Sequence, residues 1–341
     1  MRIAVLGAGS LGTIAGAYIA AGGQDVELID VYQAHVDALN ETGAKITGTT
    51  DFHAEVKAIT PENMSGVYDL VLLLTKQLYN HSILQDLLPF LNDQSTVLSL
   101  QNGIPEEQVA SIVGRERVVA GSVEFGATFI KPGVSELTTE FNRFKEYAFQ
   151  IGELTGEVTE RIEQIKKILD LVGGTHISTN LVGTKWSKLL INNAFSGLSA
   201  ALNTEFGGVL DHEISVESAV HIADETIKVA HANGVEFADM GGFDIASLEV
   251  KSEKDIPERI QTLRDIMRSS RLLKASMLQD LEKKRKTEID YINGVIPRLA
   301  LEKGIPTPYN DMVVSLVKHA EETKELPVFD SNIKFFEELN N

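Results

Sequence analysis

The chain lacks several residue types that particular kinds of chemistry require. It contains no cysteine, which excludes disulfide bonds, thiolate metal ligands and cysteine nucleophiles. No apolar run approaches the roughly 20 residues that a membrane-spanning helix needs. Lys and Arg number 31 against 49 Asp and Glu, so the net charge is −18. Such a surface repels nucleic acids and anionic membranes, and local cations must attract any anionic substrate.

Length and composition predict an ordinary globular protein of two domains. The chain has 341 residues, 43% of them hydrophobic, which is enough for two packed cores. It opens on a strand pattern and shows none of the basic and apolar segments of a secretory signal. We therefore expect a cytoplasmic protein that binds neither nucleic acid nor membrane. The sequence does not determine the oligomeric state, and a homodimer is compatible with it.

The N-terminal segment has the pattern of a dinucleotide-binding β-α-β unit. An apolar strand at 3–6 leads into Gly7-Ala8-Gly9-Ser10-Leu11-Gly12, a helical pattern follows, and a second strand at 26–29 ends at Asp30. A glycine-rich motif alone is weak evidence, and a turn without any ligand is the alternative. The flanking strand, helix and acid make the signal strong. The predicted contacts to the cofactor pyrophosphate are Gly7, Gly9, Ser10, Leu11 and Gly12.

Asp30 predicts the choice of cofactor. A carboxylate at the end of the second strand suits the ribose 2′-hydroxyl of NAD. No Lys or Arg occurs from 26 to 40, so the 2′-phosphate of NADP would meet a carboxylate and no nearby cation. We therefore expect NAD as cofactor, with NADH preferred over NADPH. Helix capping is the alternative role for Asp30, and it does not exclude ribose binding.

Lys76 and Asn102 follow two further predicted strands, at 68–75 and 95–100. Ligands of open α/β sheets bind at the carboxyl ends of the strands. A solvated strand end and a turn residue before glycine are the alternatives. Because both residues share the position where ligands bind, we favour cofactor contacts for them.

The rest of the chain predicts an α/β fold with two domains. A Rossmann-type domain is expected over 1–178 and an all-helical domain over 179–341. The predicted antiparallel additions to the sheet lie at 118–130, 135–140 and 147–154. The clearest helical patterns in the second domain lie at 180–202, 216–232, 274–302 and 309–323.

Polar residues interrupt two of these helical patterns. Lys188 and Asn192 are four residues apart among apolar neighbours, so a helix places them one turn apart, and Ser196 continues that face. A lysine that only snorkels to solvent is the alternative to an ammonium directed into a cleft. Ser276 and Glu288 are twelve apart in the pattern at 274–302, so one helix would place them on one face.

Three segments together resemble the ketopantoate reductase (2-dehydropantoate 2-reductase) family. They are Gly7–Gly12, Trp186–Asn192, and Ser276–Asp280 continuing to Thr287–Gly294. The resemblance spans nearly the whole chain. It implies a Rossmann domain followed by a helical domain, and the reduction of ketopantoate to the (R)-hydroxy acid pantoate, a step of pantothenate biosynthesis.

The resemblance also implies roles for residues. Lys188 would be the catalytic lysine and general acid, and Glu288 would orient it and contact the substrate. The chemistry of the residues agrees, because reduction of a 2-keto acid leaves an alkoxide that needs a proton and a nearby positive charge. The implied binding contacts are Asn192 and Ser276 to substrate oxygens, Asn102 near the nicotinamide, and Lys76 near the cofactor.

Two positions depart from the family pattern on its substrate side. Family members typically have Asn-Pro-Leu-Thr-Ala where this chain has Ser196-Gly197-Leu198-Ser199-Ala200, and often an Asn where this chain has Phe206. Ser196 can still donate one hydrogen bond to a substrate, whereas Phe206 adds apolar surface. The alternative is that neither position lines the pocket.

These departures leave other functions open. An NAD-dependent D-2-hydroxyacid dehydrogenase on the same scaffold would reduce branched or aromatic 2-keto acids. A non-catalytic dinucleotide sensor would keep Asp30 and the glycine motif but would not need Lys188 paired with Glu288. No metal site is expected, because the consecutive residues Asp211-His212-Glu213 do not share a helix face.

Overall fold

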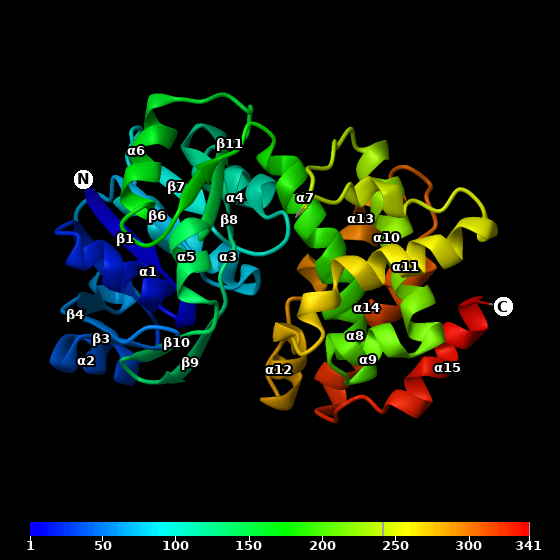
Figure 1. Cartoon of the computed structure of the whole chain (residues 1–341). Helices are drawn as coiled ribbons and strands as arrows, with labels where there is room; N and C mark the ends of the chain where they lie inside the picture. Colours follow the sequence, from blue (N-terminus) through cyan, green and yellow to red (C-terminus); the bar gives the residue numbers. More distant parts are fainter. Residues whose placement is uncertain (241, 341) are drawn as a thin grey trace. The chain divides into compact units, whose positions relative to one another are not determined.

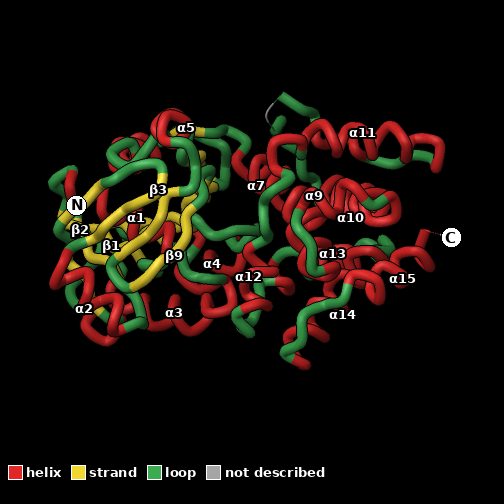
Figure 2. The backbone as a smooth tube through the Cα atoms, turned by 60° about the horizontal axis from the view of Figure 1, so that its bottom comes forward, coloured by secondary structure: helices red, strands yellow, loops and turns green. Residues whose placement is uncertain are grey.

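The computed structural model describes residues 1–240 and 242–340. The chain divides into two compact units, Met1–Leu181 and Val182–Asn341 (Figure 1). Strands gather in the first unit, and helices build the second (Figure 2). Within the described residues, every helix is too short or too polar to cross a lipid bilayer.

The first unit alternates strands with helices. Its strands are β1 (Arg2–Leu6), β2 (Asp25–Ile29), β3 (Ala44–Gly48), β4 (Phe52–Ala54), β5 (Lys57–Ile59), β6 (Leu70–Leu73), β7 (Thr96–Ser99), β8 (Val118–Val123), β9 (Ala127–Lys131), β10 (Val134–Leu137), β11 (Phe149–Glu153) and β12 (Thr175–Ile177). Its helices are α1 (Ser10–Ala21), α2 (Gln33–Thr42), α3 (Asn80–Leu87), α4 (Glu106–Val113), α5 (Phe141–Glu146) and α6 (Glu160–Leu169).

The main sheet has the order β12-β11-β8-β7-β6-β1-β2-β5. The strands from β5 to β8 are parallel to their neighbours and follow the 3-2-1-4-5-6 order of a Rossmann fold. The predicted fold class, an α/β Rossmann-type domain followed by a helical region, is confirmed. The predicted domain boundary at 178 falls in the segment between β12 and the next helix.

The main sheet is buried on both faces because its strands are apolar throughout. In β1, Ile3 and Val5 point into a core with α1 and α6, whereas Ala4 and Leu6 point into a second core with α3 and α4. Because successive side chains of a strand point to opposite faces of the sheet, one apolar strand contributes residues to both cores.

The predicted antiparallel additions are partly wrong. β8 is parallel to β7, and in the main sheet only β11 pairs antiparallel, with β8. β9 and β10 belong to a second sheet, of order β4-β3-β10-β9, in which β10 pairs parallel with β3. This second sheet packs on α1, where the rings of Tyr18 and Phe52 stack with centroids 4.1 Å apart. Pairing between strands so far apart in the sequence leaves no local pattern from which it could be predicted.

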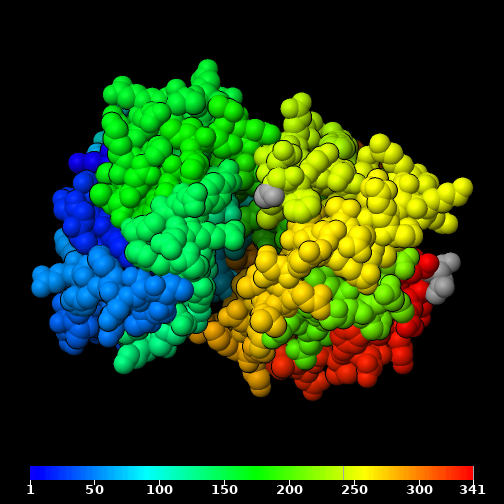
Figure 3. All heavy atoms as spheres, viewed as in Figure 1, coloured from blue at the N-terminus to red at the C-terminus, as the bar shows by residue number. Residues whose placement is uncertain are grey.

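The second unit is helical. Its helices are α7 (Leu181–Ile191), a π-helix (Asn192–Gly197), α8 (Leu198–Leu202), α9 (Phe206–Asp211), α10 (Glu213–Ala232), α11 (Ile256–Ile266), α12 (Ser276–Glu282), α13 (Val295–Leu301), α14 (Pro308–Thr323) and α15 (Phe329–Asn340). Helix α10 is the centre of the unit and packs on α9, α11, α13, α14, α15 and the π-helix. The stretch that contains α11, drawn in yellow, lies at the surface on the face shown in Figure 3.

The single helix predicted over 274–302 is wrong, because α12 ends at Glu282. Lys284 has a φ of 56°, so it adopts the left-handed conformation that usually requires glycine. The N–H groups of Lys284 and Arg285 donate to the carbonyl oxygens of Leu281 (2.9 Å) and Asp280 (2.8 Å), which is the Schellman pattern of a helix end. Ser276 and Glu288 therefore lie on separate elements and do not share a helix face.

We predict that Lys284→Gly stabilises the second unit by about 0.5–1 kcal/mol. Relief of the left-handed strain should outweigh the larger entropy of glycine in the unfolded chain. Urea unfolding followed by the fluorescence of Trp186 measures this, because Trp186 is the only tryptophan and is buried in α7. Lys283→Gly is the matched control, since Lys283 has a φ of −87° and gains nothing from glycine. A lower urea midpoint for Lys284→Gly than for the unchanged protein would contradict the prediction.

Candidate active site

Four loops of the first unit leave the main sheet at one edge. The register pairs Leu6 with Ile29 and with Leu73, and Leu73 with Ser99, so the parallel strands β2, β1, β6 and β7 end side by side. The loops that follow these strands carry the predicted cofactor contacts: the glycine motif, Asp30, Lys76 and Asn102. One edge of one sheet thus collects residues from four separate parts of the sequence.

The three glycines of the motif have different structural reasons to be glycine. Gly7 has a φ of 99°, and a Cβ there would lie 2.7 Å from the backbone nitrogen of Thr75. A Cβ on Gly12 would lie 2.1 Å from the carbonyl oxygen of Gly7. A Cβ on Gly9, by contrast, would meet no protein atom within 4 Å. The fold itself therefore requires Gly7 and Gly12, whereas the backbone at Gly9 faces open space that a ligand can approach.

Helix α1 starts directly at this space. Gly9 is the residue before its first turn and supplies no side chain to cap the helix. Ser10 and Leu11 form that turn, and the first N–H groups of a helix have no acceptor within it. The N–H groups and the helix dipole favour a phosphate, so the loop fits the pyrophosphate of a dinucleotide.

Asp30 follows β2 and is fixed by the backbone. Its N–H donates to the carbonyl oxygen of Ile59 (3.1 Å), and its Oδ1 accepts from the N–H of Tyr32 (2.9 Å). The turn thus fixes the direction of the carboxylate through one of its oxygens. Among the residues that the structure describes, no Lys or Arg forms an ion pair with Asp30.

His35, which the sequence interpretation missed, supports the glycine loop from α2. Its Nδ1 accepts from the N–H of Gly133 (3.0 Å), so the ring proton lies on Nε2, which is 2.8 Å from the carbonyl oxygen of Ala8. Nε2 also lies 3.1 Å from Oγ1 of Thr13 in α1. Burial lowers the pKa of His35 below its usual value and so favours the neutral ring. The neutral imidazole on α2 thus ties the glycine loop to the turn at Gly133, between β9 and β10. No local motif predicts this contact, because both partners are distant from His35 in the sequence.

Side-chain amides tie the loops of Lys76 and Asn102 together. Gln77 donates from Nε2 to the carbonyl oxygen of Asn102 (2.5 Å), and Gln101 donates from Nε2 to the carbonyl oxygen of Thr75 (2.7 Å). Each loop thus carries a glutamine that bonds the backbone of the other. The two glutamines, also missed from the sequence, fix the positions from which Lys76 and Asn102 project.

In the second unit, Lys188 lies in α7, just before the π-helix that begins at Asn192. Lys188 and Asn192 are half-buried, and Ser196 is 9% exposed. The Oγ of Ser196 lies 3.4 Å from the Oδ1 of Asn192. π-helical turns inside α-helices are rare and occur frequently at functional sites. The structure thus places the polar pair Asn192 and Ser196 beyond Lys188 on a helix of altered geometry. Lys185, on the same helix, is also buried (4% exposed).

The other predicted substrate contacts of this unit lie on three elements. Ser276 opens α12 and is exposed, and Glu288 is half-buried before a short turn. Phe206 opens α9, is 7% exposed, and its ring centroid lies 5.5 Å from that of Phe195. Its N–H donates to the carbonyl oxygen of Leu273 (3.1 Å), which ties α9 to the segment before α12.

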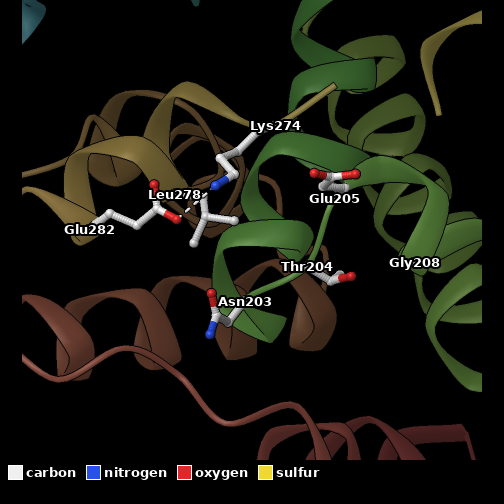
Figure 4. A pocket seen from close by; sticks show the side chains of 7 residues that line it. All are labelled: Asn203, Thr204, Glu205, Gly208, Lys274, Leu278 and Glu282. Carbon is white, nitrogen blue, oxygen red and sulfur yellow. Dashed lines mark hydrogen bonds and ion pairs between the residues drawn. The ribbon is translucent and has the colours of Figure 1, made fainter. Parts of the chain in front are cut away.

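A cavity of about 370 Å³ opens beside α9 and α12 (Figure 4). Its lining residues are Asn203, Thr204, Glu205, Gly208, Lys274, Leu278 and Glu282. The Nζ of Lys274 and the Oε1 of Glu282 form an ion pair at 2.8 Å. None of the lining residues is a predicted site residue, so we assign no part of the chemistry to this cavity.

Comparison with known sequences agrees with this organisation. The family profile "Ketopantoate reductase PanE/ApbA" matches residues 3–150, and its C-terminal counterpart matches residues 180–321. A protein of Pyrococcus horikoshii named 2-dehydropantoate 2-reductase is 32% identical over 324 residues, which covers 94% of this chain and 98% of that protein.

Solved structures show the same likeness. A ternary structure of D-mandelate dehydrogenase with NADH and anilino(oxo)acetate matches with a TM-score of 0.81 and 26% identity, covering 95% of this chain and 99% of that one. A PanE/ApbA family ketopantoate reductase from Ralstonia eutropha matches with a TM-score of 0.80 and 27% identity, over the same shares.

A Rossmann-type sheet with a dinucleotide loop, followed by a helical unit that carries a half-buried lysine, defines a nicotinamide-dependent oxidoreductase. Two profile matches and a 32% identical relative then give the family directly. The chain belongs to the ketopantoate reductase family.

We predict that Gly9→Ala leaves the fold intact but weakens NADH binding by roughly tenfold or more, because the added methyl group enters the space of the pyrophosphate. Gly12→Ala is the contrasting variant, since its Cβ collides with the Gly7 carbonyl inside the protein. Fluorescence titration with NADH gives the affinity, and thermal melting gives the stability. Unchanged NADH affinity in a folded Gly9→Ala protein would show that the pyrophosphate does not approach Gly9.

Proposed function

We propose that this protein reduces a 2-keto acid to the (R)-2-hydroxy acid with a nicotinamide cofactor, and that ketopantoate is the first candidate substrate. The observation that carries the proposal is the position of Lys188. It is a half-buried lysine one helical turn before the amide of Asn192, in a family whose curated relatives are named 2-dehydropantoate 2-reductase. A purely dinucleotide-sensing protein would have no use for this lysine.

The proposed chemistry assigns a role to each side chain. The reduced nicotinamide, when bound, supplies a hydride to the keto carbon. Lys188 stabilises the negative charge that develops on the keto oxygen and donates the proton that completes the hydroxyl group. Glu288 favours the charged form of Lys188 and orients it. Asn192, Ser196 and Ser276 supply hydrogen bonds to substrate oxygens.

The cofactor contacts follow from the first unit. The loop 7–12 and the first turn of α1 would hold the pyrophosphate, Lys76 would lie near the cofactor, and Asn102 beside the nicotinamide. Asp30 supports a preference for NADH. Its carboxylate would accept from a ribose hydroxyl but repel a 2′-phosphate, and it makes no ion pair with a described Lys or Arg. The D-mandelate dehydrogenase structure with NADH shows that a similar fold holds this cofactor.

A second candidate is an NAD-dependent D-2-hydroxyacid dehydrogenase for branched or aromatic 2-keto acids. Phe206 favours it, because its ring packs on Phe195 and offers carbon surface where the family often has an amide. The similarity to a D-mandelate dehydrogenase favours it as well. Ser196 still allows a hydrogen bond to a substrate hydroxyl, so the choice between the two rests on measured specificity.

Lys188→Ala should lower kcat by roughly 10²–10⁴-fold, the usual scale for the loss of a positioned acid. NADH affinity should change little, because the predicted cofactor contacts lie in the first unit. Steady-state kinetics and an NADH titration test both statements. Lys303→Ala, at an exposed lysine of the same unit, is the control for the loss of one positive charge. Near-normal turnover of Lys188→Ala would refute the proposed role.

One set of steady-state assays tests both the cofactor preference and the substrate preference. We expect NADH to exceed NADPH in kcat/KM by on the order of a hundredfold, since a carboxylate facing a phosphate costs a few kcal/mol. The substrates are ketopantoate, 2-ketoisovalerate, 2-ketoisocaproate and phenylglyoxylate, each with both cofactors. Equal or better kcat/KM with NADPH would reject the role of Asp30.

The same assays separate the two candidate functions. A site built to bond the hydroxyl of ketopantoate should prefer ketopantoate by roughly 10³ or more, which would reject the second candidate. An apolar acid ahead by a similar factor would reject ketopantoate, and Phe206→Asn should then shift the preference back towards it.

A further inference from the structure

Helix α14 contacts the turn that carries Glu288 at three points. The turn, residues 287–294, is the second part of the connection between α12 and α13. The contacts are the Thr287 N–H to Glu321 Oε1 at 2.6 Å, Asp290 Oδ1 to Lys318 Nζ at 2.5 Å, and Asn293 Nδ2 to Asn310 Oδ1 at 3.0 Å. The turn is therefore held at its start, its middle and its end.

The spacing along α14 explains why one helix can make all three contacts. Asn310 and Glu321 are eleven residues apart, which is about three helical turns, so both project from the same face. The contacts run in opposite order along the helix and the turn, with Asn310 on Asn293 and Glu321 on Thr287. The turn thus lies antiparallel along one face of α14.

The N-terminus of α14 is itself fixed by Glu225 of α10. The buried carboxylate of Glu225 accepts from the N–H groups of Tyr309 (2.8 Å) and Asn310 (2.9 Å). It also accepts from Nδ2 of Asn310 (2.7 Å), which leaves the Oδ1 of Asn310 to accept from Asn293. Burial raises the pKa of Glu225 to about 7. The central helix of the unit thus sets the orientation of the amide that holds the turn.

Asn293 links the turn to the π-helix that starts at Asn192. Its Nδ2 donates to the carbonyl oxygen of Asn193 (3.1 Å). Its Oδ1 sits so close to Gly197 that a Cβ there would lie 1.9 Å away. The side chain of Asn293 thus fills the place that a larger residue at 197 would take. The turn of Glu288 and the segment of Asn192 are parts of one hydrogen-bonded assembly.

We propose that α14 is the positioning element for Glu288, with Glu321 and the Glu225–Asn310 pair as its positioning residues. This inference rests on the role proposed above for Glu288. The positioning residues act only through Glu288 and do not need to touch the substrate. The turn has no long helix of its own to hold it, so its geometry depends on the side chains that α14 supplies. Loosening these contacts should misplace Glu288 without removing it.

Glu321 allows the sharpest test. Glu321→Ala removes the acceptor of the Thr287 N–H and should lower kcat for the 2-keto acid by roughly tenfold, since small misplacements of reacting groups are costly. Glu321→Gln keeps an acceptor oxygen and should stay within about twofold of the unchanged enzyme. Glu322→Ala, at the exposed neighbouring residue, is the matched control. NADH affinity should be unchanged in all three.

A double-variant measurement separates positioning from general destabilisation. In a Glu288→Gln background, Glu321→Ala should lower kcat by less than about twofold, because the group that it positions is already lost. Hydrogen exchange of the amides in 287–294 should be faster in Glu321→Ala and unchanged in Glu322→Ala. Lys318→Ala, at the more exposed contact, replaces Glu321→Ala if that variant fails to fold, and the same pattern is expected with a smaller loss.

The outcomes distinguish the two proposals. If Glu288→Gln is impaired but Glu321→Ala turns over normally, positioning by α14 is overturned and the proposed function stands. Equal losses from Glu321→Ala with and without Glu288 would also overturn it, as would a Glu321→Gln enzyme as impaired as Glu321→Ala. Normal turnover of Glu288→Gln would refute the role of Glu288 and this inference with it, while the Lys188→Ala result would still test the reduction itself.

Discussion

A parallel sheet with strands in register brings the end of every strand to one edge, and the first unit depends on this constraint. β2, β1, β6 and β7 are paired so that Leu6, Ile29, Leu73 and Ser99 lie side by side. Four loops then begin together, although they come from residues 7 to 102. The strands determine where the loops begin, and hydrogen bonds from His35, Gln77 and Gln101 fix the conformation of the loops. Packing on both faces of the sheet holds the register, since a slip of one residue would exchange the side chains that fill the two cores.

The second unit reaches its order by different means. Its proposed catalytic residues lie on α7, on the π-helix and on a short turn, so no common backbone frame relates them. Buried polar side chains make the connection: Asn293 donates to the carbonyl oxygen of Asn193 and to Oδ1 of Asn310, and Asn310 donates to Glu225. The directions of these hydrogen bonds restrict how the elements can pack, although the Oδ1 atoms of Asn193 and Asn293 are buried without a partner among the described residues. In this unit, therefore, hydrogen-bond direction as well as hydrophobic packing determines the geometry of the site.

The sequence was most informative where the signal is local. The strand, glycine motif, helix and acid up to Asp30 lie within about 30 residues, so their order alone predicts the fold and the loop. Lys76 and Asn102 could be placed because each follows an apolar strand. His35 could not be recognised, since its two backbone partners, Ala8 and Gly133, lie 27 and 98 residues away.

Irregular backbone and long-range strand pairing account for the remaining errors. The single helix predicted over 274–302 is interrupted at Lys284, which ends α12 in a left-handed conformation that lysine seldom adopts. The π-helix is equally hidden, because Asn192–Gly197 continue the helical pattern that runs from α7 into α8. The pairing of β10 with β3 joins segments about 90 residues apart, and nothing in either strand specifies its partner.

The contact between Gly197 and Asn293 has a consequence for how the sequence can evolve. Members of the family typically have proline at the position of Gly197, and proline carries a Cβ. In such chains the side chain at position 293 must be seated differently, because here it occupies the volume of that Cβ. A residue larger than glycine at 197 therefore has to shift the turn that carries Glu288. A substitution in the helix is thus felt in a segment that lies 96 residues further along the chain.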